Sequence, residues 1–322
     1  MFKLRFKKYL LISLALVFLV GTLLTGCGAE DDDTVTLGYQ TALSHTAAIV
    51  AVNQDFFAEE GLNIDAKLFS SGPDVNEAVA AGSVDFGTMG DTPVIMATAG
   101  GLPVKVLAGI GGGAERQRLM VRKDSDIESV QDLVGKEVGV RRGTSAHGGF
   151  YRLLENEGLA DDEISVVDIR PEDMPDSLAT EQVDAVLIWE PTPTVIEGEG
   201  IGRQIANLVG TGNEYLSFAL VNQAFAEQNE EQVLQFMRAL DRAVDFIEEN
   251  PEKTAQIVAE VTGLSEDLAA SAVDNHYFRL ELDAEIKASL EDTAEFLYEN
   301  GDISTIPDFD AALDKSYLDK IQ

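Results

Sequence analysis

Short β-rich segments alternate with helical segments along most of this chain of 322 residues. Each β-rich segment is a brief run of mainly apolar residues. In the helical segments apolar residues recur every three or four positions, as Ile49, Val52 and Phe56 do in the helix predicted over 46–60. Parallel strands need a crossover between them, which is usually a helix, so this alternation predicts an α/β fold with mostly parallel sheets flanked by helices. The predicted strands are 35–39, 64–69, 84–88, 104–110, 119–122, 138–140, 164–169 and 185–189.

The last third of the chain has a different pattern. From Gln223 onward it is almost entirely helical, with an apolar stripe that begins at Phe225 and with arginine and glutamate on the other side. We therefore expect a helical C-terminal tail. The chain length favours about two domains, and 45% hydrophobic residues indicate a packed protein rather than a disordered one.

The N-terminal segment is typical of an export signal. Lys3, Arg5, Lys7 and Lys8 precede a sixteen-residue apolar run, which is shorter than the roughly 20 residues of a spanning helix. The run ends in Leu-Thr-Gly-Cys at 24–27, which resembles the lipobox of bacterial lipoproteins. We expect a signal peptide at 1–26, lipid on Cys27 and a solvated tether at 27–34. An uncleaved anchor helix or an ordinary secretory signal are the alternatives.

Composition excludes several kinds of partner and site. The formal charge is −34, and loss of the four basic residues before Cys27 would leave −38. Such an excess repels nucleic acid and anionic lipid surfaces, and it is also typical of a heavily hydrated surface in salty surroundings. Because Cys27 is the single cysteine, the chain can form no internal disulfide or thiolate metal cluster.

The sequence also contains a weak internal echo. Segments 78–87 (AVAAGSVDFG) and 178–187 (LATEQVDAVL) both end a helix, continue with Val-Asp and begin a strand. Each strand then leads to an acid near a proline, Asp91 in the first case and Glu190 in the second. This similarity predicts two α/β lobes that each present a loop at the carboxyl ends of their strands, where open α/β sheets bind ligands.

Segments from Val35 to the helical tail resemble one family, the substrate-binding proteins of ABC importers for nitrate, taurine and aliphatic sulfonates, with a branch for thiamine-pyrimidine precursors. The segments that carry the resemblance are GYQ at 38–40, FFAEEGLNI at 56–64, GSVDFGTMGDTP at 82–93, RRGTSAH at 141–147 and DAVLIWEP at 184–191.

The resemblance implies a two-lobed type II periplasmic-binding-protein fold. Lobe I is expected at 35–122 plus 215–322 and lobe II at 123–214, with crossings near 121–124 and 213–217. It also implies that the protein passes a small anion or zwitterion to permease subunits served by a cytoplasmic ATPase. Together with the lipobox, this predicts a monomer that is lipid-anchored on the outer face of the cytoplasmic membrane. Neither cofactor nor metal is expected.

The segment 143–147 is the candidate anion site. It follows a predicted strand and opens a helix, so free backbone amides and the positive helix end can face an oxyanion. Thr144 and Ser145 add hydroxyl donors, and His147 could serve as a neutral donor. The alternatives are that Thr144 or Ser145 only caps the helix and that His147 packs on its own lobe.

The segment 90–93 is the expected counterpart on the other lobe. Thr92 offers a hydroxyl, while Asp91 and Glu190 offer carboxylates that suit the cationic end of a zwitterion such as taurine. Asp91 could instead cap its own helix. Two carboxylates would repel bare nitrate.

Further contacts are predicted at lower priority. Gln40 follows the first strand, as do Tyr39 and His45, and Trp189 could form a wall against an alkyl chain. Arg116 and Arg118 could reach a sulfonate, although salt bridges with the many acids are favoured. Arg141 and Arg142 would raise the local positive potential, and the glycines at 111–113 are expected to free the chain near the crossing.

No catalytic residue is predicted. Three scattered histidines match no metal-ligand spacing, and Ser145 lacks a nucleophile-elbow context. The enzymatic alternative is a pyrimidine-synthesising relative on the same fold, which would be expected to lack an export signal. A receptor that presents its ligand to a sensor, or one for nitrate or a thiamine-pyrimidine precursor, also remains open.

Overall fold

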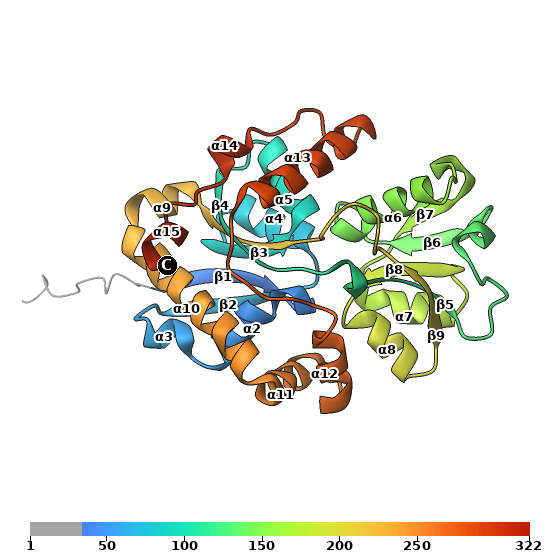
Figure 1. Cartoon of the computed structure of the whole chain (residues 1–322), viewed down its shortest axis with the longest axis horizontal. Helices are drawn as coiled ribbons and strands as arrows, with labels where there is room; N and C mark the ends of the chain where they lie inside the picture. The colour runs from blue at the N-terminus through green and yellow to red at the C-terminus, as the bar shows by residue number, and fades with distance from the viewer. Residues whose placement is uncertain (1–33) are drawn as a thin grey trace, which may run out of the picture. The chain divides into compact units, whose positions relative to one another are not determined.

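A computed structural model describes residues 34–322, so the predicted signal peptide, Cys27 and nearly all of the predicted tether lie outside the described residues. The first of two five-stranded sheets has the order β2-β1-β3-β10-β4 (Figure 1). β1, β2 and β3 are parallel, and β10 runs antiparallel to both of its neighbours. The strands are β1 Val35–Gln40, β2 Ile64–Phe69, β3 Phe86–Gly90, β4 Val104–Gly111 and β10 Ser217–Asn222.

The second sheet repeats this plan with the order β7-β6-β8-β5-β9. β6 is parallel to β7 and β8, and β5 is the antiparallel strand between β8 and β9. The prediction of mostly parallel sheets is confirmed, with one antiparallel strand in each. The strands are β5 Gln117–Arg122, β6 Glu137–Val140, β7 Ser165–Asp168, β8 Ala185–Trp189 and β9 Gly202–Asn207.

The chain passes between the sheets twice, and the first passage is earlier than expected. Segment 35–122 was assigned to lobe I, yet β5 pairs with β8 and β9 in the second sheet. The first crossing therefore lies between β4 and β5, before Gln117 and not near 121–124. The return lies between β9 and β10. Strand propensity alone cannot reveal which sheet a strand joins, because the partner strands are distant in sequence.

Helices cover both faces of each sheet. In Figure 1, α4 and α5 lie on the opposite side of the first sheet from α2 and α10, and α6 and α7 flank the second sheet in the same way. Buried apolar side chains form one cluster around each sheet. The helices before the return crossing are α2 Thr46–Asn53, α3 Phe56–Glu59, α4 Gly72–Ala80, α5 Asp91–Ala99, α6 Ser145–Asn156, α7 Met174–Ala179 and α8 Thr192–Gly198; single 3-10 turns are η1 Leu43–His45, η2 Ala114–Arg116, η3 Val130–Leu133, η4 Asp161–Glu163 and η5 Pro171–Asp173.

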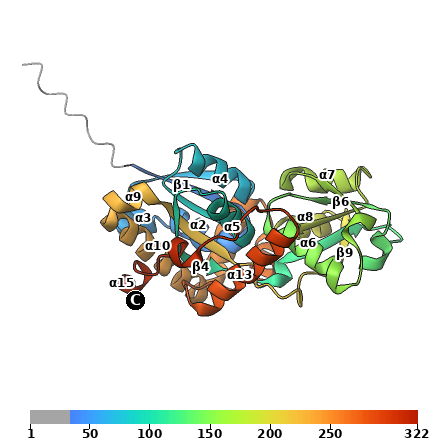
Figure 2. The same ribbon diagram turned by 90° about the horizontal axis from the view of Figure 1, so that it is seen from above.

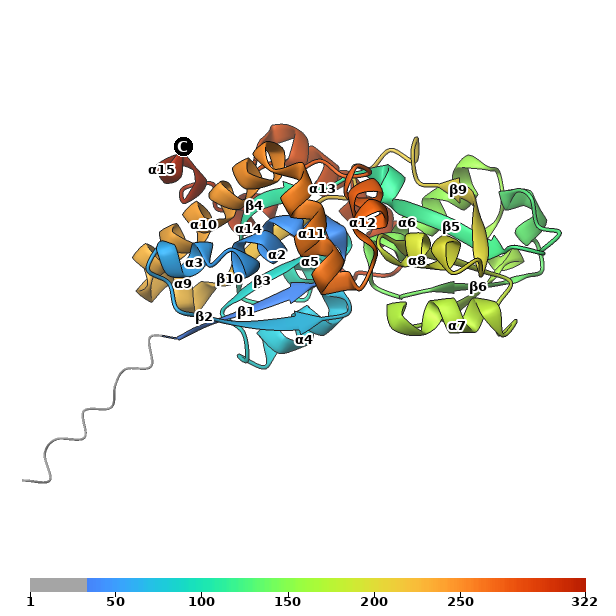
Figure 3. The ribbon, with the colours of Figure 1, turned by 90° about the horizontal axis from the view of Figure 1, so that it is seen from below.

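The helical tail is confirmed, and it packs mainly on the first sheet. Phe236 of the longest tail helix, α10, stacks on Phe57 and Phe86. α13 lies against α5, and α12 lies against α8 of the second sheet (Figures 2 and 3). The tail helices are α9 Gln223–Gln228, α10 Glu230–Glu249, α11 Pro251–Thr262, α12 Glu266–Val273, α13 Ala284–Glu299, α14 Phe309–Ala312 and α15 Leu318–Ile321. Within the described residues, no helix combines the length and apolar character needed to cross a membrane.

The tail also packs against the first crossing. Gly109 and Gly112 form isolated bridges with Glu281 and Tyr277. A Cβ atom on Gly113, whose φ is +137°, would lie 2.7 Å from the carbonyl oxygen of Asn275. The glycines at 111–113 therefore allow close backbone approach, which the sequence analysis had attributed to chain freedom alone.

Candidate functional site

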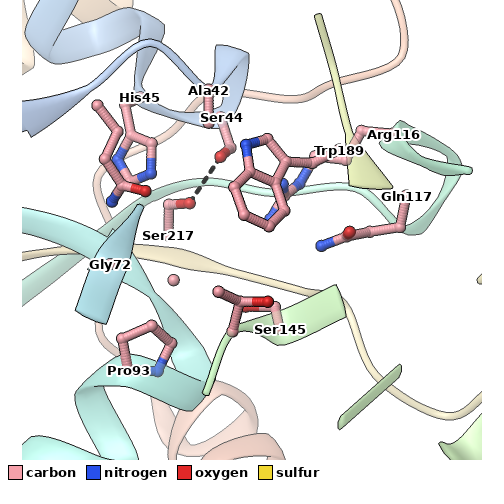
Figure 4. Close-up of a pocket in the computed structure, with 13 residues that line it drawn as sticks. Ala42, Ser44, His45, Gly72, Pro93, Arg116, Gln117, Ser145, Trp189 and Ser217 are labelled. Carbon is pink, nitrogen blue, oxygen red and sulfur yellow. Dashed lines mark hydrogen bonds between the residues drawn. The ribbon is translucent and has the colours of Figure 1, made fainter. Parts of the chain in front are cut away.

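A small cavity lies where strand ends and helix starts of the two sheets meet (Figure 4). Its volume is about 20 Å³, which is enough for about one water molecule. The lining residues are Gln40, Ala42, Ser44, His45, Gly72, Gly90, Pro93, Arg116, Gln117, Thr144, Ser145, Trp189 and Ser217. No acidic residue is among them. Four of the eight predicted ligand contacts line the cavity, namely Gln40, Thr144, Ser145 and Trp189.

Arg116 is the central cation of the cavity. It is 3% exposed, and its Nη2 donates to the carbonyl oxygen of Tyr215 at 2.7 Å. Its Nε has no hydrogen-bond partner, and no carboxylate oxygen lies within 4.0 Å of the guanidinium in the described part of the chain. Burial lowers the pKa of Arg116 to about 10, partly offset by Asp91, Tyr277 and Tyr215, so it stays protonated near neutral pH.

The expectation of salt bridges thus does not hold for Arg116, whereas it holds for Arg118. Arg118 donates to Glu190 at 3.0 Å, to Glu197 at 2.6 Å and to Gln204 at 2.5 Å. An unpaired buried cation is uncommon, because the loss of hydration is not repaid by a fixed partner. The arrangement favours an anion as the missing partner of Arg116.

Two neutral histidines accompany Arg116. The pKa values of His45 and His276 are each lowered to about 3, first by burial and then by the positive charge of Arg116. His276 Nδ1 lies 3.0 Å from the carbonyl oxygen of Ala272. His45 lines the cavity, and its Nδ1 has no partner. The local charge of the cavity wall at neutral pH is therefore that of Arg116 alone.

The start of α6 forms another part of the cavity wall. Thr144 is the N-cap in an extended conformation, and Ser145 is the first helical residue. The Oγ1 of Thr144 donates to the carbonyl oxygen of Arg141 at 2.6 Å, which fixes the loop rather than capping the helix. The first amides of a helix have no helical acceptor and carry the positive end of its dipole, so this tip adds to the field of Arg116.

Asp91 and Thr92 are buried but do not line the cavity. The Oδ1 of Asp91 accepts the Thr92 amide at 2.6 Å and also accepts a short hydrogen bond from the Oγ of Ser145. Its Oδ2 is buried without a partner. Asp91 therefore links the starts of α5 and α6, which belong to different sheets.

Glu190 also does not line the cavity. Its side chain is fully buried, with Oε1 bound to Arg118 and Oε2 accepting the amide of Thr194 at 3.2 Å. Burial raises the pKa of Glu190, while Thr194 and Arg118 oppose the shift. Because its acceptors are used, the predicted pair of carboxylates around a ligand ammonium is not assembled here.

His147 likewise does not line the cavity. It is buried on α6, with its ring edge-on to Tyr151 at 5.0 Å. Burial lowers the pKa of His147 most, Asp302 raises it, and Arg142 lowers it further. Among the remaining candidates, Gln40 donates through Nε2 to the carbonyl oxygen of Thr88 at 2.9 Å, and Trp189 forms part of the wall (Figure 4).

Three polar wall residues, Gln117, Ser217 and Ser44, were not predicted from the sequence, and Arg116 had low priority. Gln117 begins β5, fully buried, and neither atom of its amide has a partner. Ser217 begins β10, and its Oγ donates to the Oγ of Ser44 at 2.8 Å. Gln117 and Ser217 enter the site because β5 follows the first crossing and β10 follows the second, and both are the antiparallel strands of their sheets. A polar residue at the start of an otherwise apolar strand was the available signal.

The two mixed sheets, covered by helices and joined by two crossings, have the two-lobed type II periplasmic-binding-protein fold. The chain belongs to the NMT1/THI5-like family, whose sequence profile matches residues 42–254. The matched region contains every cavity residue except Gln40.

Named relatives and solved structures are similar to this chain. The taurine-binding periplasmic protein of Escherichia coli (strain K12) is 26% identical over 286 residues, which cover 84% of this chain and 88% of the relative. The alkanesulfonate-binding protein SsuA from Xanthomonas axonopodis pv. citri, solved bound to MOPS, is 25% identical with a TM-score of 0.80, over 87% of this chain and 97% of SsuA. The desulfurization enzyme DSZB, at 17% identity and a TM-score of 0.69 over 89% of this chain and 98% of its own, shares the fold alone.

Proposed function

We propose that this protein is the extracytoplasmic solute-binding component of an ABC importer and that it captures a small sulfonate-type anion between its two lobes. The observation that carries the proposal is Arg116, a buried guanidinium without a carboxylate partner that faces a cavity beside the start of α6. Arginine with backbone amides is a strong donor set for an anionic oxygen. The names of the taurine- and alkanesulfonate-binding relatives support a sulfonate.

The proposed ligand contacts are revised from the sequence analysis. Arg116, Ser145 and the amides at the start of α6 would hold the oxyanion, with Gln40, Thr144 and Trp189 completing the wall. Thr92 and His147 would support the site from behind. Glu190 would hold Arg118, and Asp91 would position Ser145. The taurine-like zwitterion remains a candidate ligand, but it would not meet two free carboxylates.

We propose lobe I at 35–113 plus 215–322 and lobe II at 117–212, with the hinge in the two crossings. Contacts between the lobes include Ser145 with Asp91, and Arg141 with Asp74 at 3.3 Å. A sulfonate is larger than the present cavity, so its entry requires the lobes to move apart about the hinge. Closure over the ligand would then create the surface that the permease recognises.

The lipid anchor, the monomeric state and the location follow from the same proposed role. Lipid on Cys27 would hold a monomeric receptor on the outer face of the cytoplasmic membrane, close to permease subunits and their ATPase. Nitrate or a thiamine-pyrimidine precursor would be the alternative solutes. An enzymatic role on this fold is the more distant alternative, and no group of three metal-ligating side chains occurs within residues 34–322.

The test is a calorimetric titration of the purified protein with taurine, ethanesulfonate, nitrate and a hydroxymethylpyrimidine. We expect at least one sulfonate to bind with micromolar or tighter affinity and to raise the melting temperature. Binding of nitrate or the pyrimidine alone would overturn the sulfonate assignment. Gene neighbours that encode a permease and an ATPase would support import over presentation to a sensor.

A further inference from the structure

Gln117 is the polar side chain of the cavity whose hydrogen-bonding capacity is entirely unused. Its side chain is fully buried, and both Nε2 and Oε1 are without partners in the described structure. Figure 4 shows the amide directed into the space between Trp189 and Ser145. Burying both ends of an amide without partners is costly, so this position indicates a group that arrives with the ligand.

The two ends of the amide are not equivalent in this cavity. Donors are abundant, since Arg116 Nε, the start of α6 and the hydroxyl of Ser44 can all serve an oxyanion. No carboxylate can accept, because Glu190 and Asp91 are off the wall and no acidic residue lines it. The remaining side-chain acceptors are the amide oxygen of Gln40, hydroxyl oxygens and one histidine nitrogen. Whichever way the Gln117 amide is turned, one end accepts a hydrogen bond. His45 offers an acceptor on one ring nitrogen only, and the tautomer decides which.

We infer that Gln117 is a specificity-determining residue that accepts a hydrogen bond from a hydroxyl or amino group on the ligand. This inference rests on the proposed function and narrows its substrate class. The ligand is a short sulfonate with an O–H or N–H donor, and a plain alkanesulfonate is a poor substitute. A plain alkyl group would leave the Gln117 carbonyl oxygen buried without a donor, and this penalty creates the discrimination.

A trapped water is the competing explanation of the unused amide, because the cavity has room for about one. A water that stayed beside Gln117 would satisfy the amide for every ligand equally. It would therefore produce no preference between ligands that differ only in a donor. The two explanations predict different affinity ratios.

The experiment compares ethanesulfonate, 2-hydroxyethanesulfonate and taurine by calorimetry on the purified protein and on two variants. Gln117→Met keeps the length of the side chain and removes both polar ends. Gln182→Met makes the same change at an exposed position and serves as the matched control. Thermal unfolding without ligand reports whether each variant is folded.

The unmodified protein should bind at least one donor-bearing ligand about 10-fold or more tighter than ethanesulfonate. Gln117→Met should reduce this ratio to within about 3-fold, and Gln182→Met should leave it unchanged. Equal affinities for all three ligands in the unmodified protein would overturn the inference and leave the proposed function intact. An unchanged affinity ratio in Gln117→Met would likewise overturn the inference and leave the proposed function intact. If none of the three sulfonates binds, the proposed function fails and the inference fails with it. A misfolded Gln117→Met variant leaves the ligand comparison on the unmodified protein as the deciding result.

Discussion

Arg116 directly precedes β5 and Arg118 is its second residue, yet the two arginines have opposite surroundings. Arg118 is held by Glu190 and Glu197, and Arg116 by a single carbonyl oxygen. With 57 acidic residues in the chain, a carboxylate for Arg116 would have been easy to supply. The contrast separates an arginine that stabilises the fold from one whose charge is left for a ligand.

The largest effect is expected for Arg118→Met. The substitution would leave the carboxylate of Glu190 buried without its cation, which destabilises a protein by about 3–5 kcal/mol. Denaturant unfolding without ligand measures the change. Arg118→Met with Glu190→Met should recover much of the loss, because neither member of this buried ion pair then remains. Equal stability of the single variant and the unmodified protein would contradict the structural role.

Arg116→Met should have the opposite effects, a large loss of ligand affinity and little loss of stability. We expect ligand affinity to fall about 100-fold or more, because a charge-assisted contact is lost. The free energy of unfolding without ligand should change little or increase, since the guanidinium is buried without a carboxylate. Calorimetry and unfolding on the same preparation test both halves. A large loss of stability with unchanged affinity would make the two arginines alike and would refute the comparison.

The two histidines beside Arg116 should make the stability of the ligand-free protein depend on pH. His45 and His276 have folded pKa values of about 3, so they bind fewer protons than unfolded histidines, whose pKa is about 6.5. Stability without ligand should therefore fall as the pH drops below about 6.5. Each histidine should contribute about 2 kcal/mol between pH 7 and 5. Unfolding at pH 7, 6 and 5 should show a smaller slope for His276→Gln, and an unchanged slope would contradict the assignment.

The smallest effect on ligand binding is expected for Gly90→Ala, at a contact between the two lobes. Gly90 has a φ of −70°, which suits alanine, but a Cβ there would lie 2.5 Å from the Oγ of Ser145 on the other lobe. Gly90→Ala should weaken ligand binding by about 3- to 10-fold, because the added methyl group disfavours the closed form that holds the ligand. The free energy of unfolding should change by no more than about 0.5 kcal/mol. Calorimetry and thermal unfolding test both. Unchanged affinity would show that this contact is not needed for closure.

Much of the architecture was predictable from local pattern. The strands at 64–69 and 185–189 were predicted with their observed bounds. The first alternates apolar and polar residues, as a half-buried strand does, and the second is an uninterrupted apolar run typical of a buried strand. The helix predicted over 46–60 is instead α2 and α3, since Asp55 adopts a left-handed conformation with a φ of 57°. β9 escaped prediction because its residues are half-buried and its pattern is weak.

Local sequence patterns determined the alternation of strands and helices, the helical tail and the loop at 143–147, because these depend on neighbours within a few positions. Composition determined the acidic charge. Tertiary structure alone decided that β5 and β10 run antiparallel within the two sheets and that Gln117 and Ser217 reach the cavity. It also decided that Glu190 faces Arg118 and leaves Arg116 unpaired. Charge pairing depends on distances between residues far apart in the chain, which no local pattern records.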